Sequence, residues 1–478
     1  MATRKVVVTY VAGSLLGPSC YILDIGAYRI MVDCGLDFGM WDEDTHESVK
    51  RAYKNKKMVG PDLQDSFFAD RKIDAVVLTH NHLDHCGGVS LALKHMKDDA
   101  KIWSLPLTSD VLEIVLDSTF KHSPYLFVDG PFEKDEALSR RAHLHLGEQE
   151  LLPGLKIFVK DPGHLPGAAS IIFDLGGDER GLITGDMAIH NQPITPAAAM
   201  CSLDVPKEWL PTRVLGTDLT HGGEDHMFDY DVEMQRFLDT VRLAWDRSAK
   251  IAVAAFAHGR GPNVAVRLAQ EGYTVYIDGQ IVDVLRAYAE HLIFDDIDFD
   301  TIRLIESDEH RDFLLAHDGP VIVVTTSGMG EVGSPIVTYI DAWISDPNNL
   351  ICFTSYLVPV STGGRLLKES LRRTEDPLAP RRKDDLLGDL DEFAQIDRFH
   401  LSAHTDLYGF GTYLEDMVVA RGGVKLRSIS LTHGTGKTLR KAKELFAHLA
   451  DKVFYPAKGE QIIIEIEVDD DVCEVIAS

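Results

Sequence analysis

Residues 79–88 read THNHLDHCGG and place four potential metal ligands within six residues: His80, His82, Asp84 and His85. An apolar run before them predicts a buried strand. Side chains two apart in extended chain point the same way, so His80 and His82 could approach one cation together, while Asp84 and His85 could turn toward a second. Imidazole and carboxylate suit zinc. A solvated histidine-rich loop is the alternative, and the spacing H-x-H-x-D-H, set between a strand and a Gly-Gly pair opening a helix expected over 89–96, disfavours it.

Three further residues could join this cluster. His164 lies in a Gly/Pro loop between two predicted strands, where a ligand can be delivered from a strand end. Asp186 follows another predicted strand, and its two oxygens could bridge two cations. Asp33 ends a third strand, where an acid is either a turn former or a hydrogen-bond partner of a metal ligand. The sequence leaves these two roles of Asp33 open.

Composition limits the partners. The 478 residues suggest two to four domains, and the 45% hydrophobic content is that of a globular protein. A net charge of -27 opposes nonspecific binding to nucleic acid. A polyanionic substrate would therefore need a local basic groove in addition to the metals.

Cysteine usage and hydropathy indicate the compartment. The six cysteines include no C-x-x-C pair, which argues against a disulfide framework and a cysteine zinc site and suits a reducing cytosol. No run of about 18 apolar residues and no signal-peptide core is found. We therefore expect a soluble, cytoplasmic protein without membrane contact.

The second half of the chain alternates between predicted helices and strands. Helices are expected at 229–245, 262–270 and 281–292, with apolar strands between them. Such alternation predicts parallel β-α-β units and hence a second α/β domain inserted into the first. We expect the first domain at 1–215 and 396–478, and the inserted domain at 216–395. The polar stretch 41–67 is expected to lie over the site or on the surface.

Three further residues stand at the ends of predicted strands. Asp218 follows a strand in LGTDLTHGG, His404 lies in SAHTD, and His433 lies in LTHG. A histidine at a strand tip is commonly a surface or core residue, but these contexts favour a role in the site.

The order Asp33, H-x-H-x-D-H, His164, Asp186 resembles the metallo-β-lactamase superfamily, an αββα sandwich with metals at one edge of two packed sheets. With Asp218, His404 and His433 matching motifs A, B and C, the chain resembles the β-CASP nucleases of that superfamily. TSGM at 326–329 and TGGR at 362–365 extend the resemblance. Within this branch the chain most resembles the nuclease subunit of the cleavage and polyadenylation specificity factor and its prokaryotic relatives. Its resemblance to ribonuclease J is weaker.

The resemblance implies a set of roles. His80, His82 and His164 would bind one zinc ion, Asp84, His85 and His433 a second, and Asp186 would bridge them. Two divalent ions about 3.5–4 Å apart can hold a bridging hydroxide and neutralise the charge of phosphodiester hydrolysis. His404 would contact the scissile phosphate or protonate the 3′ leaving oxygen, and Asp218 would orient His404 or a metal-bound histidine. We group Asp84, Asp218 and His404 as catalytic candidates.

A histidine at motif C is typical of the RNA enzymes of this branch, so His433 favours RNA as substrate, and we expect that RNA to be single-stranded. Substrate-binding candidates are Arg260, Ser327, Arg365 and Ser402. The two arginines stand in glycine-rich turns after strands, where parallel α/β units place ligand sites.

The chain departs from the branch at three motifs. Asp218 is followed by Leu-Thr-His rather than Ser/Thr-Thr-Tyr, Arg260 lacks the glutamine that usually follows two residues later, and Thr435 stands where an acid is common. None of these positions is a predicted ligand, so they bear on substrate contact rather than on hydrolysis.

The leading interpretation is a zinc-dependent ribonuclease with two Zn²⁺ per chain, acting as an endonuclease and leaving 5′-phosphate and 3′-hydroxyl ends. A 5′→3′ exoribonuclease, a small-molecule metallo-hydrolase and a non-catalytic subunit of an RNA-processing complex are the alternatives. The inserted domain disfavours a small substrate, and the complete ligand set disfavours an inactive subunit. A homodimer and an unidentified protein partner are left open.

Overall fold

The computed structural model describes residues 2–37, 58–221, 229–291, 299–376 and 380–468. The chain forms two compact units. The first comprises Met1–Asn191, Ala197–Met227 and His404–Ser478, and the second comprises Gln192–Pro196 and Phe228–Ala403. The second unit is thus an insertion in the first, and both Asp218 and His404 belong to the first unit.

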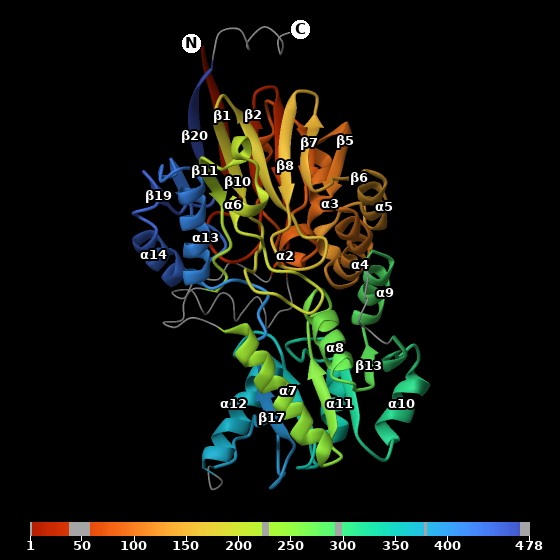
Figure 1. Cartoon of the computed structure of the whole chain (residues 1–478). Helices are drawn as coiled ribbons and strands as arrows, with labels where there is room; N and C mark the ends of the chain where they lie inside the picture. Colours follow the sequence, from red (N-terminus) through yellow and green to blue (C-terminus); the bar gives the residue numbers. More distant parts are fainter. Residues whose placement is uncertain (1, 38–57, 222–228, 292–298, 377–379, 469–478) are drawn as a thin grey trace. The chain divides into compact units, whose positions relative to one another are not determined.

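Two seven-stranded sheets form the first unit (Figure 1). One sheet has the order β20 (Glu460–Val468), β1 (Ala2–Tyr10), β2 (Tyr21–Ile25), β3 (Tyr28–Val32), β4 (Ile73–Val77), β5 (Met96–Ser104) and β6 (Arg141–His143). The other has the order β19 (Val453–Phe454), β18 (Ser428–Ser430), β11 (Arg213–Gly216), β10 (Glu179–Ile183), β9 (Ser170–Gly176), β8 (Leu155–Lys160) and β7 (Gly147–Leu152). In each sheet an antiparallel part continues into a parallel part, from β3 to β6 and from β10 to β19.

Alternation along the strands explains why the two sheets pack face to face. In β4, Ala75 and Val77 join a core shared by both sheets, whereas Val76 between them is buried on the opposite face. In β9, Ile171 and Phe173 point into the shared core, and Ile172 joins a second core. Both faces of each sheet are therefore covered, which is the layered sandwich that the sequence predicted.

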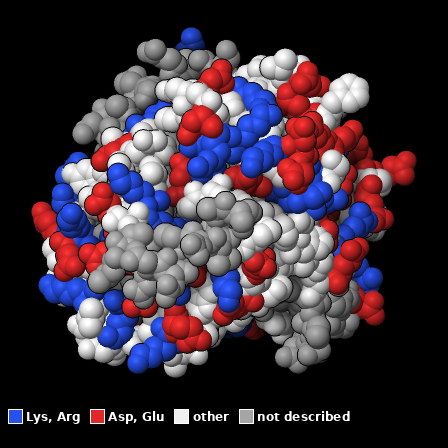
Figure 2. All heavy atoms as spheres, turned by 90° about the horizontal axis from the view of Figure 1, so that it is seen from above, with Lys and Arg blue, Asp and Glu red and all other residues white. Residues whose placement is uncertain are grey.

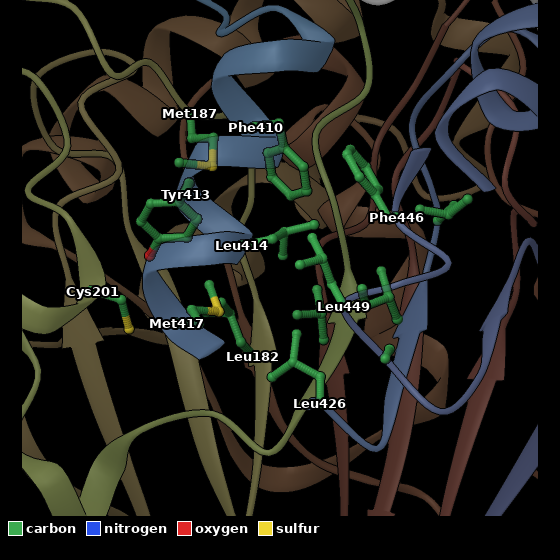
Figure 3. Close-up of a cluster of buried hydrophobic side chains, with 14 of the residues drawn as sticks. Leu182, Met187, Cys201, Phe410, Tyr413, Leu414, Met417, Leu426, Phe446 and Leu449 are labelled. Carbon is green, nitrogen blue, oxygen red and sulfur yellow. The ribbon is translucent and has the colours of Figure 1, made fainter. Parts of the chain in front are cut away.

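Helices supply the outer layers. The first unit contains α2 (Leu83–Cys86), α3 (Val89–Ala92), α4 (Pro106–His122), α5 (Pro131–Ser139), α6 (Cys201–Asp204), α13 (Leu407–Ala420) and α14 (Gly436–Leu445). The outer core of the second sheet combines Leu182 of β10 with Phe410, Leu414 and Met417 of α13 and with Phe446 after α14 (Figure 3). Helix α4 contacts β5 and β6 of the first sheet. Short 3₁₀ turns lie at η2 (Asp65–Phe67), η3 (Leu93–His95), η4 (Pro124–Leu126) and η5 (Lys207–Trp209).

Two local expectations need correction or restriction. The sequence predicted one helix over 89–96, but α3 ends at Ala92, a 3₁₀ turn follows, and Met96 already begins β5. Of the polar stretch 41–67, residues 41–57 lie outside the described part of the chain. In the remainder, Val59 pairs with Asp37 in an isolated antiparallel bridge, so this end of the stretch is tied to the chain after β3.

The second unit is built on a parallel sheet. Its order is β14 (Ile302–Leu304), β13 (Val275–Asp278), β15 (Val321–Thr325), β12 (Lys250–Ala254), β16 (Leu350–Phe353) and β17 (Gln395–Arg398), and all neighbours run parallel. The helices are α7 (Tyr230–Asp246), α8 (Arg260–Gln270), α9 (Ile281–His291), α10 (Asp308–Ala316), α11 (Pro335–Trp343) and α12 (Thr362–Glu375), with η6 at Phe299–Thr301. The predicted β-α-β alternation is confirmed.

Within the described residues, no helix has the length and apolarity needed to cross a bilayer. Five cysteines, at 20, 34, 86, 201 and 352, are buried free thiols, as their scattered spacing indicated. On the face shown in Figure 2, basic and acidic side chains are interspersed.

Candidate metal centre

The H-x-H-x-D-H segment forms a tight turn after β4. This turn is hydrogen-bonded to the chain that follows β3. His85 N donates to His82 O (3.0 Å), and Cys34 N donates to His85 O (2.8 Å). A Cβ atom on Gly35 would lie 1.7 Å from Asp84 O, so only glycine permits this approach. The helix begins at Leu83, earlier than the Gly-Gly pair where the sequence placed it. The two first histidines therefore lie on the turn beyond the strand rather than along it.

A second close approach positions His164. The loop after β8 is held by Ala188 N, which donates to Pro162 O at 2.9 Å. Gly163 has a φ of 72°, and a Cβ there would meet Ala188 O and Ala198 N, each at 2.3 Å. Glycine is thus required just before His164, which is fully buried.

The predicted ligands converge in the first unit. His80, His82, His164 and Asp186 form one group, and Asp84, His85 and His433 form another, with the potential ligand atoms of each group within 4.8 Å of one another. These are the two groups that the family resemblance implied. Asp186, Asp218 and His404 form a third group by the same criterion.

Asp186 stands between the two groups. Its Oδ2 lies 3.5 Å from His80 Nε2 and 3.7 Å from His164 Nε2. Its Oδ1 lies 3.3 Å from His85 Nε2 and 3.6 Å from His433 Nε2. Each carboxylate oxygen therefore faces a different group, which is the arrangement that a bridging ligand needs.

The donor set fits two divalent cations. The Nε2 atoms of His80 and His85 and Oδ1 of Asp186 are buried without a hydrogen-bond partner. Burying one such atom without a hydrogen bond costs about 1–3 kcal/mol. An arrangement in which three such atoms point at one another is therefore unfavourable unless they bind a cation. Imidazole nitrogens and carboxylate oxygens are the ligands of zinc and related divalent metals.

Asp33 contacts Nδ1 of His85, the ring nitrogen that does not face Asp186. Asp33 Oδ2 lies 2.7 Å from His85 Nδ1, and its oxygens also accept from Thr79 N (2.8 Å) and Ser19 Oγ (3.2 Å). The Asp33 carboxyl group can accept the Nδ1 proton of His85, in the tautomer that leaves the Nε2 lone pair for a cation. Of the two roles that the sequence left open, the geometry matches the partner of a ligand. Asp33 has a φ of 57°, a conformation that aspartate tolerates better than most residues.

Asp218 and His404 form a second such pair. Asp218 Oδ2 lies 2.9 Å from His404 Nδ1 and accepts from Met187 N at 2.9 Å, while its Oδ1 accepts from Thr220 N at 3.0 Å. His404 Nδ1 is also 3.9 Å from Asp186 Oδ2. Asp218 is therefore fixed by two backbone donors and orients the imidazole of His404.

Charge in this cluster is set by burial and by neighbouring groups. Burial opposes the ionisation of Asp186, but His85, His433 and His404 hold its pKa well below the usual range. Burial, followed by the charge of His85, lowers the pKa of His80 well below its ordinary value. Burial also opposes the charging of His404, yet Asp218 and Asp186 raise its pKa to about 9. Asp186 is thus anionic, His80 offers a neutral nitrogen, and His404 carries a proton at neutral pH.

The four substrate-binding candidates belong to the second unit. Arg260 begins α8, is buried, and donates through Nη1 to Thr354 O. Arg365 is exposed on α12 and donates to Asp384 O at 2.7 Å. Ser327 follows β15 and contacts the carboxylate of Glu331, and Ser402 is buried after β17. Their role in substrate binding stays a prediction.

The sequence analysis missed Thr79. Its Oγ1 lies 2.9 Å from Asp33 Oδ2, 3.1 Å from His80 Nδ1 and 3.3 Å from His85 Nδ1, so one hydroxyl links three site residues. A pattern in the sequence could have drawn attention to it. The triplet Leu-Thr-His occurs three times, ending in a predicted ligand at 78–80 and 431–433 and in His221, which is not a predicted ligand, at 219–221.

Two of the residues that depart from the branch motifs, His221 and Thr435, can be located in the structure. The His221 ring lies 5.8 Å from the His404 ring, so the histidine in place of tyrosine is a neighbour of motif B. Thr435 caps α14 by accepting from Thr438 N at 3.2 Å. Neither residue is in a predicted metal group.

The fold and this cluster of ligands define a metallo-hydrolase class. The model of the metallo-beta-lactamase superfamily matches residues 13–239, and the model of the Beta-Casp domain matches residues 264–366. The chain belongs to the β-CASP branch of the metallo-β-lactamase superfamily, as the motif order indicated.

Characterised relatives are distant in sequence. The chain is 24% identical over 368 residues to the "Probable RNase MJ4" of Methanocaldococcus jannaschii, a match that covers 74% of this chain and 79% of that protein. It is 24% identical over 369 residues to "Ribonuclease TTHA0252" of Thermus thermophilus, covering 73% of this chain and 78% of the relative. It is also 23% identical over 384 residues to the "Transcription termination factor FttA" of Methanosarcina mazei, covering 74% of this chain but only 56% of that protein.

A solved structure shares the fold along nearly the whole chain. A protein of unknown function from Enterococcus faecalis V583 superposes with a TM-score of 0.58 at 16% identity, covering 96% of this chain and 100% of that one. At this identity the likeness concerns the fold alone.

Proposed function

We propose that this protein is a metal-dependent ribonuclease that cleaves single-stranded RNA internally, binds two zinc ions and leaves 5′-phosphate and 3′-hydroxyl ends. Two of the relatives described above are named as ribonucleases. The observation that carries the proposal is the position of Asp186, whose two carboxylate oxygens face two separate groups of ligands.

We assign His80, His82 and His164 to one ion, Asp84, His85 and His433 to the other, and Asp186 to both. When bound, two divalent cations supply Lewis-acid activation of water and neutralise the charge that develops on the phosphate.

The other residues act on protons and orientation. His404 carries a proton at neutral pH, and donates it to the 3′ oxygen as that oxygen leaves. Asp218 keeps the His404 imidazole oriented through the contact to Nδ1, so the opposite nitrogen, Nε2, is the one that donates. Asp33 holds His85 in the tautomer whose Nε2 can bind a cation.

The test uses a linear 5′-labelled RNA and a circular RNA, each with and without chelator, together with metal analysis of the purified protein. We expect two zinc ions per chain, opening of the circle, internal cuts in the linear RNA, and loss of both activities with chelator. Ligation of an adaptor that requires a 5′-phosphate checks the product ends. Cleavage confined to linear RNA from its 5′ end would replace the endonuclease by an exonuclease.

Two further outcomes would overturn the proposal. Intact RNA together with hydrolysis of a thioester or lactone panel would indicate a small-molecule hydrolase. Fewer than one zinc ion per chain and no cleavage would favour a non-catalytic subunit.

His404→Ala tests the proton donor. We expect both zinc ions to remain and the turnover number to fall by about 10²–10⁴-fold, the usual contribution of a positioned acid. His143→Ala, at an exposed histidine of β6, is the matched control and should cleave at the wild-type rate. A His404→Ala variant as active as the control would remove His404 from the mechanism.

A further inference from the structure

Two buried threonines join the ends of β11 and β18 by a reciprocal set of hydrogen bonds. Thr217 N donates to Thr432 Oγ1 (2.7 Å), and Thr432 N donates to Thr217 Oγ1 (2.8 Å). In the other direction, Thr217 Oγ1 donates to Thr432 O (3.1 Å), and Thr432 Oγ1 donates to Thr217 O (3.0 Å). Both side chains are almost fully buried, at 3% and 1% exposure.

The pair continues the register of the parallel strands. Arg213 pairs with Ser428, so Thr217 and Thr432, each four residues further on, stand opposite one another just beyond the last paired residues. At this point the side-chain hydroxyls take over the hydrogen bonds that backbone groups make inside the ladder. The two chain segments are thereby held together between the end of the β11–β18 ladder and an isolated parallel bridge of Leu219 with Gly434, where Leu219 N donates to His433 O at 3.2 Å.

Each threonine directly precedes a residue of the candidate metal centre. Thr217 is followed by Asp218, which orients His404, and Thr432 is followed by His433, which faces Asp84 and Asp186. His433 has a φ of 55°, a conformation that costs energy for a residue other than glycine and needs support from its surroundings. The hydrogen bonds of Thr432 N and O hold the backbone of the residue directly before His433.

A third hydroxyl group reinforces the pair from the other sheet. Tyr21 OH donates to Thr432 Oγ1 at 3.0 Å, and Tyr21 belongs to β2. The Thr432 hydroxyl therefore accepts from Thr217 N and Tyr21 and donates to Thr217 O. Removing it would take this acceptor away from a buried backbone N–H and a buried phenol.

We propose that the Thr217–Thr432 pair is a positioning device that sets the Asp218 and His433 segments relative to one another, and so fixes the geometry of the cation group made by Asp84, His85 and His433. The inference rests on the proposed function, because it assumes that this group binds a cation. It concerns two residues that contact neither substrate nor cation and act through their neighbours.

The experiment is a zinc titration of the metal-free protein in competition with a chromogenic chelator. For the wild type we expect two binding events per chain. In Thr432→Val, which keeps the shape and removes the hydroxyl, we expect one event to weaken by about 10- to 100-fold and the other to stay unchanged, as is typical when the support of a ligand is lost. Thr432→Ser restores the hydroxyl and should restore the affinity.

Matched variants separate positioning from general stability. Thr119→Val removes an equally buried threonine hydroxyl that bonds only within α4, and it should leave both zinc affinities unchanged. If Thr432→Val does not fold, Tyr21→Phe removes only the outer hydrogen bond and should weaken the same single event to a smaller degree. In turnover we expect a lower kcat at unchanged KM for Thr432→Val.

The outcomes are distinguishable. Two binding events of wild-type affinity in both Thr432→Val and Tyr21→Phe would overturn the positioning role and leave the proposed function intact. Equal losses in Thr432→Val and Thr432→Ser would show that the effect does not depend on the hydroxyl and would also overturn the positioning role. A wild-type protein that binds no zinc would overturn the inference together with the proposed function.

Discussion

Oδ2 of Asp218 lies 2.9 Å from Nδ1 of His404, and these residues stand on either side of the inserted second unit in the sequence. Asp218 lies two residues beyond the end of β11, and His404 is the first residue of the chain that rejoins the first unit. The contact therefore ties both ends of the insertion to the candidate metal centre. It also explains why Asp218 belongs with the first unit, although the sequence prediction placed it in the inserted domain at 216–395, whereas His404 was already expected in the first domain.

Asp218→Asn should impair turnover without removing the metals. The amide cannot supply the charge that keeps His404 protonated, and its NH₂ group would face either Thr220 N or both Met187 N and His404 Nδ1, all of which need an acceptor. We expect kcat to fall by about 100-fold or more, with two zinc ions retained. Steady-state cleavage of a labelled RNA and metal analysis of the same preparation measure both quantities. Loss of zinc in parallel with activity would place Asp218 among the ligands instead.

Asp33→Asn should weaken one cation group. Asparagine tolerates the left-handed conformation of this position, so the backbone can stay as it is. Its NH₂ group facing His85 Nδ1 would move the imidazole proton to Nε2, which must be free to bind a cation. We expect about 10- to 100-fold lower affinity for one of two zinc ions, measured by titration against a chelator. Unchanged affinity would show that the His85 tautomer does not depend on Asp33.

Much of the fold follows from side-chain alternation and from the order of helices and strands. Ala75, Val76 and Val77, like Ile171, Ile172 and Phe173, are all apolar, so the sequence predicts buried strands, and the structure adds that Val76 and Ile172 lie on the outer faces. The short strands β6 and β19, with three and two residues, contain too few residues for such a pattern. The end of α3 at Ala92 was also missed, because η3 and the start of β5 continue the apolar spacing of a helix.

The candidate ligands were accessible to sequence reasoning because each follows a strand, and strand ends of neighbouring strands meet at one edge of a sheet. Their supports were not. Thr79, Thr217 and Thr432 look like ordinary turn residues, and the partners that reveal their roles are far away in the sequence, as in the contact of Tyr21 with Thr432. Hydroxyl groups bond to whatever the fold brings near, so their partners depend on the tertiary structure.

Gly35→Ala should disrupt the ligand turn. The new Cβ would overlap the carbonyl oxygen of Asp84, and a backbone overlap cannot be relieved by a rotamer change. The turn must move, which would displace Asp84 and His85 together. We expect the free energy of unfolding to fall by about 3 kcal/mol and zinc binding to decrease, as followed by urea denaturation and metal analysis.

Gly411→Ala is the control for this change. Gly411 lies inside α13, and a Cβ there would be 3.3 Å from the nearest atom, the ring of Phe446. A small shift of that ring would accommodate the methyl group, and alanine favours the helix. A Gly35→Ala variant that behaves like Gly411→Ala would show that the turn adapts without loss of the site.

The second unit offers a pH-dependent stability test. Asp278 at the end of β13 is buried and accepts from Arg311 Nε (2.7 Å) and Nη2 (2.9 Å) and from Tyr339 OH (2.8 Å). Burial opposes its ionisation, but Arg311 and Tyr339 outweigh burial and lower the pKa of Asp278. A carboxylate whose pKa is lower in the folded state stabilises the fold above its unfolded pKa of about 3.9 and loses this contribution as the pH falls through the folded value.

Asp278→Asn should therefore lower the free energy of unfolding by about 1.5–3 kcal/mol at neutral pH, the usual value of hydrogen bonds to a charged group. The difference from the wild type should stay constant between about pH 8 and pH 5 and shrink below about pH 4, because the wild type then loses the same charge. Asp308→Asn is the matched control, since Asp308 contacts the same Arg311 from an exposed position and should change stability by less than about 1 kcal/mol. Urea denaturation across this pH range measures the difference, and a gap that widens in acid would contradict the lowered pKa of Asp278.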